Sequence, residues 1–224
     1  MIQDDIFKKG EGDRWFLRNR AFLQSRHAVS TDIPLRLVKK IKPRPRQVLE
    51  VGASNGFRLA EIQKRYQSRV TALEPSAQAI ADGRKRFPKI RFVKGVGHKL
   101  PFTDGAFDLV IVYFVFHWID RRNLLKTASE LDRVLKPGGH LILGDFLPAS
   151  PARIRYHHLR NKEVFTYVQN YPALFLASNL YSLQNFVVAN HSTRQAGRRV
   201  PANRRTGIAL LKKDFTANYP LRKL

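Results

Sequence analysis

Four residues that can accept a hydrogen bond or take a proton each follow a short apolar run. Glu50 ends the run "VLE" and Glu74 ends "VTALE", whereas His117 follows "FDLVIVYFVF" and Asp145 follows "HLILG". Carboxylates accept hydrogen bonds from amines and hydroxyls, and an imidazole exchanges a proton near neutral pH. The four positions therefore predict a site that binds a polar ligand and can remove a proton from it.

The stretch "VLEVGASNGFRL", residues 48–59, places a glycine-containing turn directly after Glu50. Glycine allows a ligand to approach the backbone closely. Dinucleotide-binding folds use G-x-G-x-x-G here, but Gly52 and Gly56 match neither that spacing nor that count, because Ser54 stands at the middle glycine. The turn therefore predicts a ligand without a pyrophosphate. Glu74 lies about 20 residues past the turn, the usual place for an acid that accepts ribose hydroxyls.

Short apolar runs alternate with helical patterns from residue 47 onward. Strands are expected at 47–52, 69–75, 90–95, within 107–118 and at 140–146, with helices at 57–68, 76–87 and 124–135. Ser76 is a candidate N-cap, and "KPGG", residues 136–139, is expected to end the third helix. The runs "FVVANHS" and "TGIALLKKDF" are expected to form an antiparallel edge hairpin. The alternation predicts an α/β fold with a mostly parallel sheet and helices on both faces.

The chain length of 224 residues fits one domain with a small addition. Residues 1–46 are expected to form an N-terminal helical cap that ends in the basic linker "KPRPR", and residues 47–224 the main domain. Within the latter, residues 146–190 are rich in Tyr, His and Phe and do not follow the alternation, so they are expected to be an insertion.

Composition excludes several kinds of protein. The absence of cysteine rules out disulfides and thiolate zinc sites. The N-terminus is too polar for a signal peptide, and no apolar run approaches the roughly 20 residues that cross a bilayer. A cytoplasmic protein without a membrane partner is expected.

The formal net charge is +24, and basic residues concentrate in three runs, Arg36–Arg46, Arg84–Lys94 and Arg194–Arg205. A positive field attracts phosphates, nucleic acid or anionic lipid, although charge speaks to association more than to identity. The charge is compatible with an anionic or phosphate-bearing substrate, with nucleic acid, or with a solvated surface that has no specific partner.

The motifs "VLEVGASNG", "TALEPS", "LPFTDGAFDLVIVYFVFHWI" and "RVLKPGGHLIL" occur in order between Gln47 and about Phe146. In this they resemble class I S-adenosylmethionine-dependent methyltransferases of the type 11-like group. The resemblance implies a Rossmann-like seven-stranded sheet with an antiparallel last strand, and S-adenosyl-L-methionine as cofactor.

The resemblance also implies roles for individual residues. It places Glu74 on the ribose, Pro75 against the adenine, and a larger set around the methionine half and the rest of the cofactor: Glu50, Gly52, Ala53, Ser54, Gly56, Val96, Gly97 and Tyr113. Val96 departs from the family pattern, which often has an acid facing the adenine amine. The adenine edge is then expected to meet the backbone alone.

A narrower resemblance, to bacterial methyltransferases found with sugar and secondary-metabolite genes, rests on "EGDRWFLRN", "GDFLPASPARIRYHHL", "FTYVQNYPALFL" and "LLKKDF". It implies that Trp15, Arg18 and Asn19 close over the amino-acid end of the cofactor. The alternative is that Trp15 and Phe16 only fix the N-terminal helix to the sheet.

The run "RYHHL" supplies candidates for the substrate side of the site: Tyr156, His157 and His158. Adjacent histidines point in different directions on any regular element, so they are a poor metal site and no metal is expected.

A methyl group on a sulfonium is already activated, so a base matters only when the acceptor must lose a proton. His117 and Asp145 are the candidate catalytic residues; the alternatives are a packing histidine and a turn-capping aspartate. The leading hypothesis is transfer to a hydroxyl or amine of a sugar, nucleotide-linked sugar or natural product. An RNA methyltransferase, a non-catalytic binding protein on the same scaffold and another use of the sulfonium stay open. No N-P-P-Y tetrapeptide or RNP motif supports RNA.

Overall fold

The computed structural model describes residues 3–159, 161–197, 199–216 and 218–219. Arg198 of the third basic run and the outermost residues of both expected domains, 1–2 and 220–224, lie outside these ranges. Among the described residues, none of the helices has both the length and the apolar character that a membrane span requires.

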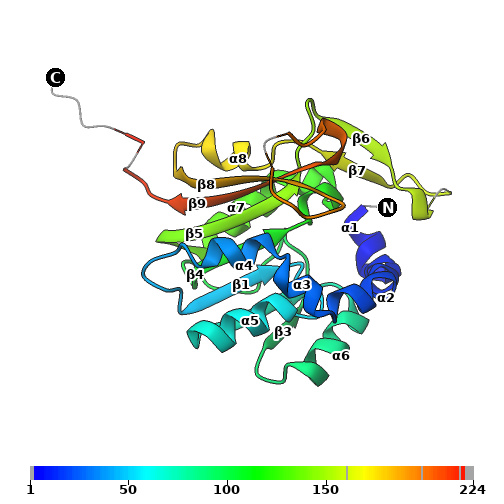
Figure 1. Ribbon diagram of the computed structural model, residues 1–224, viewed down its shortest axis with the longest axis horizontal. Coiled ribbons are helices and arrows are strands. Elements are labelled where there is room, and N and C mark those ends of the chain that lie inside the picture. The colour runs from blue at the N-terminus through cyan, green and yellow to red at the C-terminus, as the bar shows by residue number, and fades with distance from the viewer. Residues whose placement is uncertain (1–2, 160, 198, 217, 220–224) are drawn as a thin grey trace.

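Seven strands form one sheet in the order β3-β2-β1-β4-β5-β9-β8 (Figure 1). The first five in chain order pair in parallel, β9 pairs antiparallel with β5, and β8 pairs antiparallel with β9. This confirms the predicted fold, including the antiparallel last strand. The strands are β1 (Gln47–Val51), β2 (Arg69–Glu74), β3 (Arg91–Lys94), β4 (Phe107–Tyr113), β5 (Leu135–Phe146), β8 (Tyr181–Asn190) and β9 (Arg205–Lys213).

Successive residues of the central strands enter two separate apolar cores, which explains their continuously apolar sequences. Val48 of β1 and Ile111 of β4 pack in one core, whereas Leu49 and Val112 pack in the other. The first core is covered by α4 (Ile33–Val38), α5 (Phe57–Tyr66) and α6 (Ala77–Arg86), and the second by α7 (Leu124–Val134) and α8 (Pro172–Leu176). Helices thus cover both faces, and Ser76 caps α6 as predicted by accepting from the Ala79 backbone N–H.

The N-terminal segment is helical, as predicted, and comprises α1 (Gln3–Ile6), η1 (Phe7–Glu11), α2 (Gly12–Leu23), α3 (Arg26–Ser30) and α4. Its helices α1 and α2 lie beyond the carboxyl ends of the parallel strands, whereas α4 lies over the sheet (Figure 1). Because α4 belongs to the first core, the segment is packed against the main sheet rather than separate from it.

Two expectations about element ends are wrong. "KPGG" does not cap α7 but belongs to β5, because Leu135 is already extended (ψ 128°) and pairs with Phe107 of β4. The insertion does not reach residue 190, because residues 181–190 are β8 and pair with β9. What remains of it holds a hairpin of β6 (Ala152–Arg155) and β7 (Phe165–Val168), η4 (His157–Leu159) and α8.

Candidate active site

A cavity with about 900 Å³ of empty space, part of it open to solvent, lies at the carboxyl ends of β1, β2 and β4. In a parallel sheet this is the edge where ligands bind. Its walls come from the N-terminal helices, three strand ends and α7: Asp4, Phe7, Gly12, Trp15, Val51, Gly52, Ser54, Leu73, Glu74, Pro75, Gly95, Val96, Gly97, His98, Tyr113, Phe114, Val115, Trp118, Ile119 and Thr127.

The turn after β1 has a backbone that requires glycine at Gly52. Its φ is +73°, and a Cβ there would lie 2.4 Å from Cγ2 of Val115. Gly52 and Ser54 line the cavity, whereas Ala53 and Gly56 are buried and do not. Gly56, also at positive φ, faces Phe92 instead, since a Cβ would lie 2.9 Å from that ring.

Glu74 ends β2 with its carboxylate at the cavity wall. One oxygen accepts from the backbone N–H of Ser54 (2.8 Å) and the other from that of Ser76 (2.9 Å). Burial raises its pKa to about 7, although these two N–H donors oppose the rise. Each carboxylate oxygen has a further lone pair, so Glu74 can still accept two hydroxyls from a ligand.

Glu50 is buried below the turn and does not line the cavity. One of its oxygens accepts from Arg58, while the other has no hydrogen-bond partner among the described residues. Arg58 also binds Asp32 bidentately, and Asp32 caps α4 through the Leu35 N–H. Burial raises the pKa of Glu50 to about 7 against the opposing charge of Arg58. The cluster joins α4, β1 and α5 directly beneath the glycine turn.

Pro75, Val96 and Gly97 also line the cavity. A Cβ on Gly97 would lie 3.0 Å from Cγ2 of Thr127, so the backbone there is closely packed. The Thr127 hydroxyl is fully buried and has no partner among the described residues. A flat heterocycle suits this part of the cavity, and the Glu74 carboxylate suits a diol next to it. The residues present therefore fit an adenosine.

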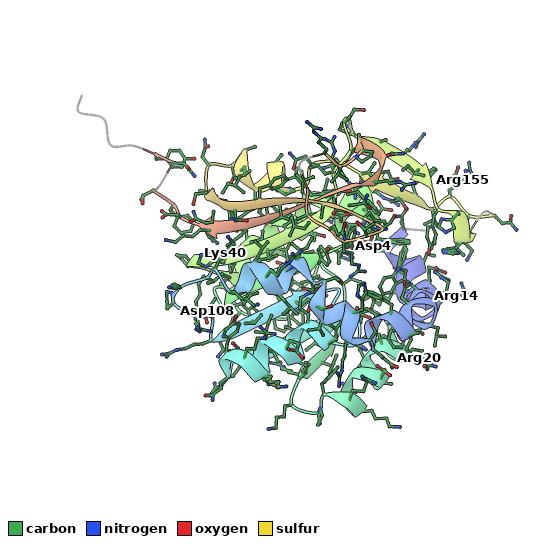
Figure 2. The ribbon with its side chains drawn as sticks, viewed as in Figure 1. Asp4, Arg14, Arg20, Lys40, Asp108 and Arg155 are labelled. Carbon is green, nitrogen blue, oxygen red and sulfur yellow. The ribbon has the colours of Figure 1, made fainter. Side chains whose placement is uncertain are left out.

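The first turn of the N-terminal segment fixes itself to the loop after β4. The Gln3 side chain donates to the carbonyls of Trp118 (2.9 Å) and Phe165 (2.7 Å) and accepts from the Phe165 N–H. Asp4, in the middle of the stick view of Figure 2, accepts from the backbone N–H of Asp120. Residues 3–15, which we call the strap, thus carry Asp4, Phe7 and Trp15 into the cavity wall.

Arg18 and Asn19, unlike Trp15, do not line the cavity. Arg18 pairs with buried Glu11 (2.5 Å) and donates to the Tyr156 hydroxyl (2.8 Å). Asn19 donates to the backbone carbonyl of Trp15. Tyr156 is buried and also donates to Glu11, so it joins the strap to the β6–β7 hairpin.

Two of the three residues expected on the substrate side are exposed. His157 and His158 follow Tyr156 on the surface at η4, and none of the three lines the cavity. Among the described residues there is no cluster of three or more His, Asp or Glu side chains arranged to hold a metal.

His117 and Asp145 form a buried pair. The His117 Nδ1 lies 2.8 Å from Oδ1 of Asp145, and the His117 backbone N–H donates to Oδ2. With Nδ1–H donated to the carboxylate, Nε2 carries the lone pair, which is the form that acts as a base. The pair does not line the cavity; its imidazole packs beside Phe114 and Trp118, which do.

Several cavity residues were not predicted from the sequence, because only contacts between distant segments of the chain bring them to the cavity. His98 lines the cavity and its Nδ1 is 3.0 Å from Asp4. Phe114 has a left-handed backbone (φ +57°), a strained conformation for a bulky residue. Strained backbone of this kind is enriched at functional sites, so it identifies Phe114 as a candidate site residue. The strain can be read only from the folded structure.

Residues 49–143 match the family model described as "Methyltransferase domain". The chain is 30% identical to a demethylmenaquinone methyltransferase of Chlorobaculum parvum over 119 residues, which are 53% of this chain and 48% of that protein. The chain spans about half the length, or less, of the curated relatives it matches.

Solved structures share the fold at low identity. A 1,6-didemethyltoxoflavin-N1-methyltransferase of Burkholderia thailandensis, solved with 1,6-didemethyltoxoflavin and S-adenosylhomocysteine bound, is 16% identical with a TM-score of 0.66, covering 95% of this chain and 87% of that one. The [4+2]-cyclase SpnF is 17% identical with a TM-score of 0.61, covering 80% of each chain.

Residues 49–143 at the centre of this chain are similar to a methyltransferase domain, and the seven-stranded sheet has the fold of a solved methyltransferase that binds S-adenosylhomocysteine.

Proposed function

We propose that this protein binds S-adenosyl-L-methionine in the cavity and transfers its methyl group to a hydroxyl or amine of a small molecule. The observation that carries the proposal is the position of Glu74, whose buried carboxylate meets the cavity one strand away from the Gly52 turn. S-Adenosylmethionine is an adenosine that carries an amino-acid tail. It requires an acid at the end of the second strand for the ribose hydroxyls, and a first strand whose backbone the ligand can approach closely. A sugar, a nucleotide-linked sugar or a natural product is the proposed acceptor class.

The cofactor, when bound, supplies an activated methyl group, so the chain has to position and desolvate the reactants. Glu74 accepts the ribose hydroxyls, Pro75 and the Val96–Gly97 backbone hold the base, and Gly52 lets the tail pass close to β1. Phe7 and Trp15 of the strap line the cavity, and their role is to keep water from the bound reactants. Positioning of this kind can supply about 7–11 kcal/mol of the barrier.

His117 is the proposed base for an acceptor that must lose a proton. Asp145 fixes the imidazole orientation through Nδ1, which leaves Nε2 to receive the proton. The imidazole packs against Phe114 and Trp118, which line the cavity, so the acceptor has to approach Nε2 beside these rings.

Calorimetry with S-adenosylhomocysteine tests the binding half of the proposal, and we expect one site per chain. Transfer of labelled methyl from S-adenosylmethionine to a panel of hydroxyl and amine acceptors tests the reaction. Absence of binding would contradict the whole proposal. Binding without transfer to any acceptor would favour a non-catalytic binding protein or another use of the sulfonium.

A further inference from the structure

Arg194, in the connection between β8 and β9, is a partly buried cation without an ionic partner. Its guanidinium lies 4.1 Å from the ring centre of Phe22 in α2. No carboxylate among the described residues forms an ion pair or hydrogen bond with its side chain. A buried charge is normally paired, because removing it from water is costly.

Asp32 cannot serve as its partner, because both of its carboxylate oxygens are already used. Burial lowers the pKa of Arg194, and Tyr113 and then Asp32 oppose this. Both Asp32 oxygens, however, bind Arg58, and one also caps α4. Arg58, which repels Arg194, is held by Asp32 and Glu50.

The position of Arg194 is fixed by the backbone of its turn. Its N–H donates to the carbonyl of Asn190 (2.8 Å), and its φ is +58°. The turn connects two antiparallel strands at the sheet end where β1, β2 and β4 have their carboxyl ends, and Figure 1 shows it on the side facing α1–α3.

The same turn reaches the proposed reacting end of the cavity. The His191 ring is 5.2 Å from that of Phe114, which lines the cavity, and 4.9 Å from that of Phe146. Phe146 in turn lies 5.0 Å from the His117 ring. The connection that carries Arg194 thus adjoins both the cavity and the His117–Asp145 pair.

We propose that Arg194 binds a negatively charged group of the acceptor, a carboxylate or a phosphate, while the body of the acceptor lies on Phe114. This rests on the proposed function and narrows its substrate class to anion-bearing small molecules with an apolar or aromatic portion. An arginine suits both anions, because its planar donors match either one with two parallel hydrogen bonds.

The test measures binding of three probes to the full chain saturated with S-adenosylhomocysteine: 4-hydroxybenzoate, phenyl phosphate and the uncharged 4-hydroxybenzamide. We expect either or both anions to bind at least tenfold more tightly than the amide, and the tighter one identifies the anion. Arg194→Gln should weaken binding of the preferred anion by about ten- to a hundredfold, the range for a hydrogen bond to a charged group, and so remove the preference. Arg194→Lys should retain part of it, since the charge stays but the two-pronged geometry is lost.

Arg199→Gln is the matched control, because Arg199 is an exposed residue of the same connection. It should leave the preference unchanged, and neither Arg194 variant should alter S-adenosylhomocysteine affinity. Equal binding of all three probes, binding of none, or an equal loss in the Arg199 variant would overturn the assignment. Failure of S-adenosylhomocysteine to bind the wild type would instead count against the proposed function. If Arg194→Gln does not fold, the Arg194→Lys variant and the wild-type comparison of anion with amide decide.

Discussion

The Glu74 carboxylate is the residue whose ionisation should control cofactor binding. Its pKa is raised to about 7 by burial, and the ionised form is the better acceptor for hydroxyls. Binding to the ionised form becomes stronger as the pH rises through the pKa. S-Adenosylhomocysteine affinity is therefore expected to increase between pH 6 and pH 8, which calorimetry at the two values measures.

Glu74→Gln keeps the shape of the side chain and removes its charge. It is expected to weaken S-adenosylhomocysteine binding by about 1–3 kcal/mol and to reduce the pH dependence. Any dependence that remains belongs to other groups, of which Glu50, with a pKa also raised to about 7, is the first candidate. A variant with wild-type affinity would remove Glu74 from the ribose role.

His117→Ala is expected to lower turnover by about 10²–10⁴ if His117 is the base. Asp145→Asn should lower turnover as well, because the pairing that fixes the imidazole tautomer is changed. Neither change should affect S-adenosylhomocysteine affinity, since neither residue lines the cavity. Normal turnover together with a lower melting temperature would show that His117 only packs.

At the scale of elements, the strap is expected to govern how fast a bound ligand leaves. Gln3→Ala removes three hydrogen bonds that join α1 to η2 (Phe116–Trp118) and β7. We expect S-adenosylhomocysteine to dissociate about tenfold faster or more, the range for losing bonds in a partly buried place. Stopped-flow displacement measures the rate.

Lys8→Ala provides the comparison for the strap, because Lys8 is an exposed residue of η1. Its dissociation rate should match that of the wild type. Equal rates for all three proteins would show that the strap does not gate the cavity.

The order of strands and helices could be predicted from the sequence because buried parallel strands and amphipathic helices have simple periods. The element that was misplaced, "KPGG", has glycines that favour a helix end and a bulged strand alike, and only pairing with β4 decides between them. The end of the insertion depended in the same way on the pairing of β8 with β9.

The site residues that directly follow the end of a strand could be predicted from the sequence. Gly52 and Glu74 lie at the cavity because the chain direction of β1 and β2 puts them there. Arg18 was expected at the same place, but Glu11 and Tyr156 hold its side chain away from the cavity. Asp4 and His98 lie far apart in the sequence, and only the folded strap brings them together.

At the scale of the whole molecule, the charge of +24 predicts weak, non-specific binding of nucleic acid. Arg14, Arg20 and Arg155 extend from the outer side of the molecule around α2 and the β6–β7 hairpin (Figure 2). For a small-molecule enzyme, tRNA binding should fall steeply with salt and no labelled methyl should enter the RNA. Filter binding at 50 and 200 mM salt with labelled S-adenosylmethionine checks both, and incorporation into RNA would favour the RNA methyltransferase hypothesis.

The cavity wall is assembled from stretches as distant in the chain as residues 4–15 and 113–127. Any molecule that fills it is held only when these stretches are docked, so it adds to the free energy of unfolding by mass action, about 2.7 kcal/mol at a hundred times its dissociation constant. Saturation with S-adenosylhomocysteine should therefore raise the melting temperature and slow proteolytic cleavage of the first fifteen residues. The free energy of unfolding should therefore increase with the concentration of the bound ligand.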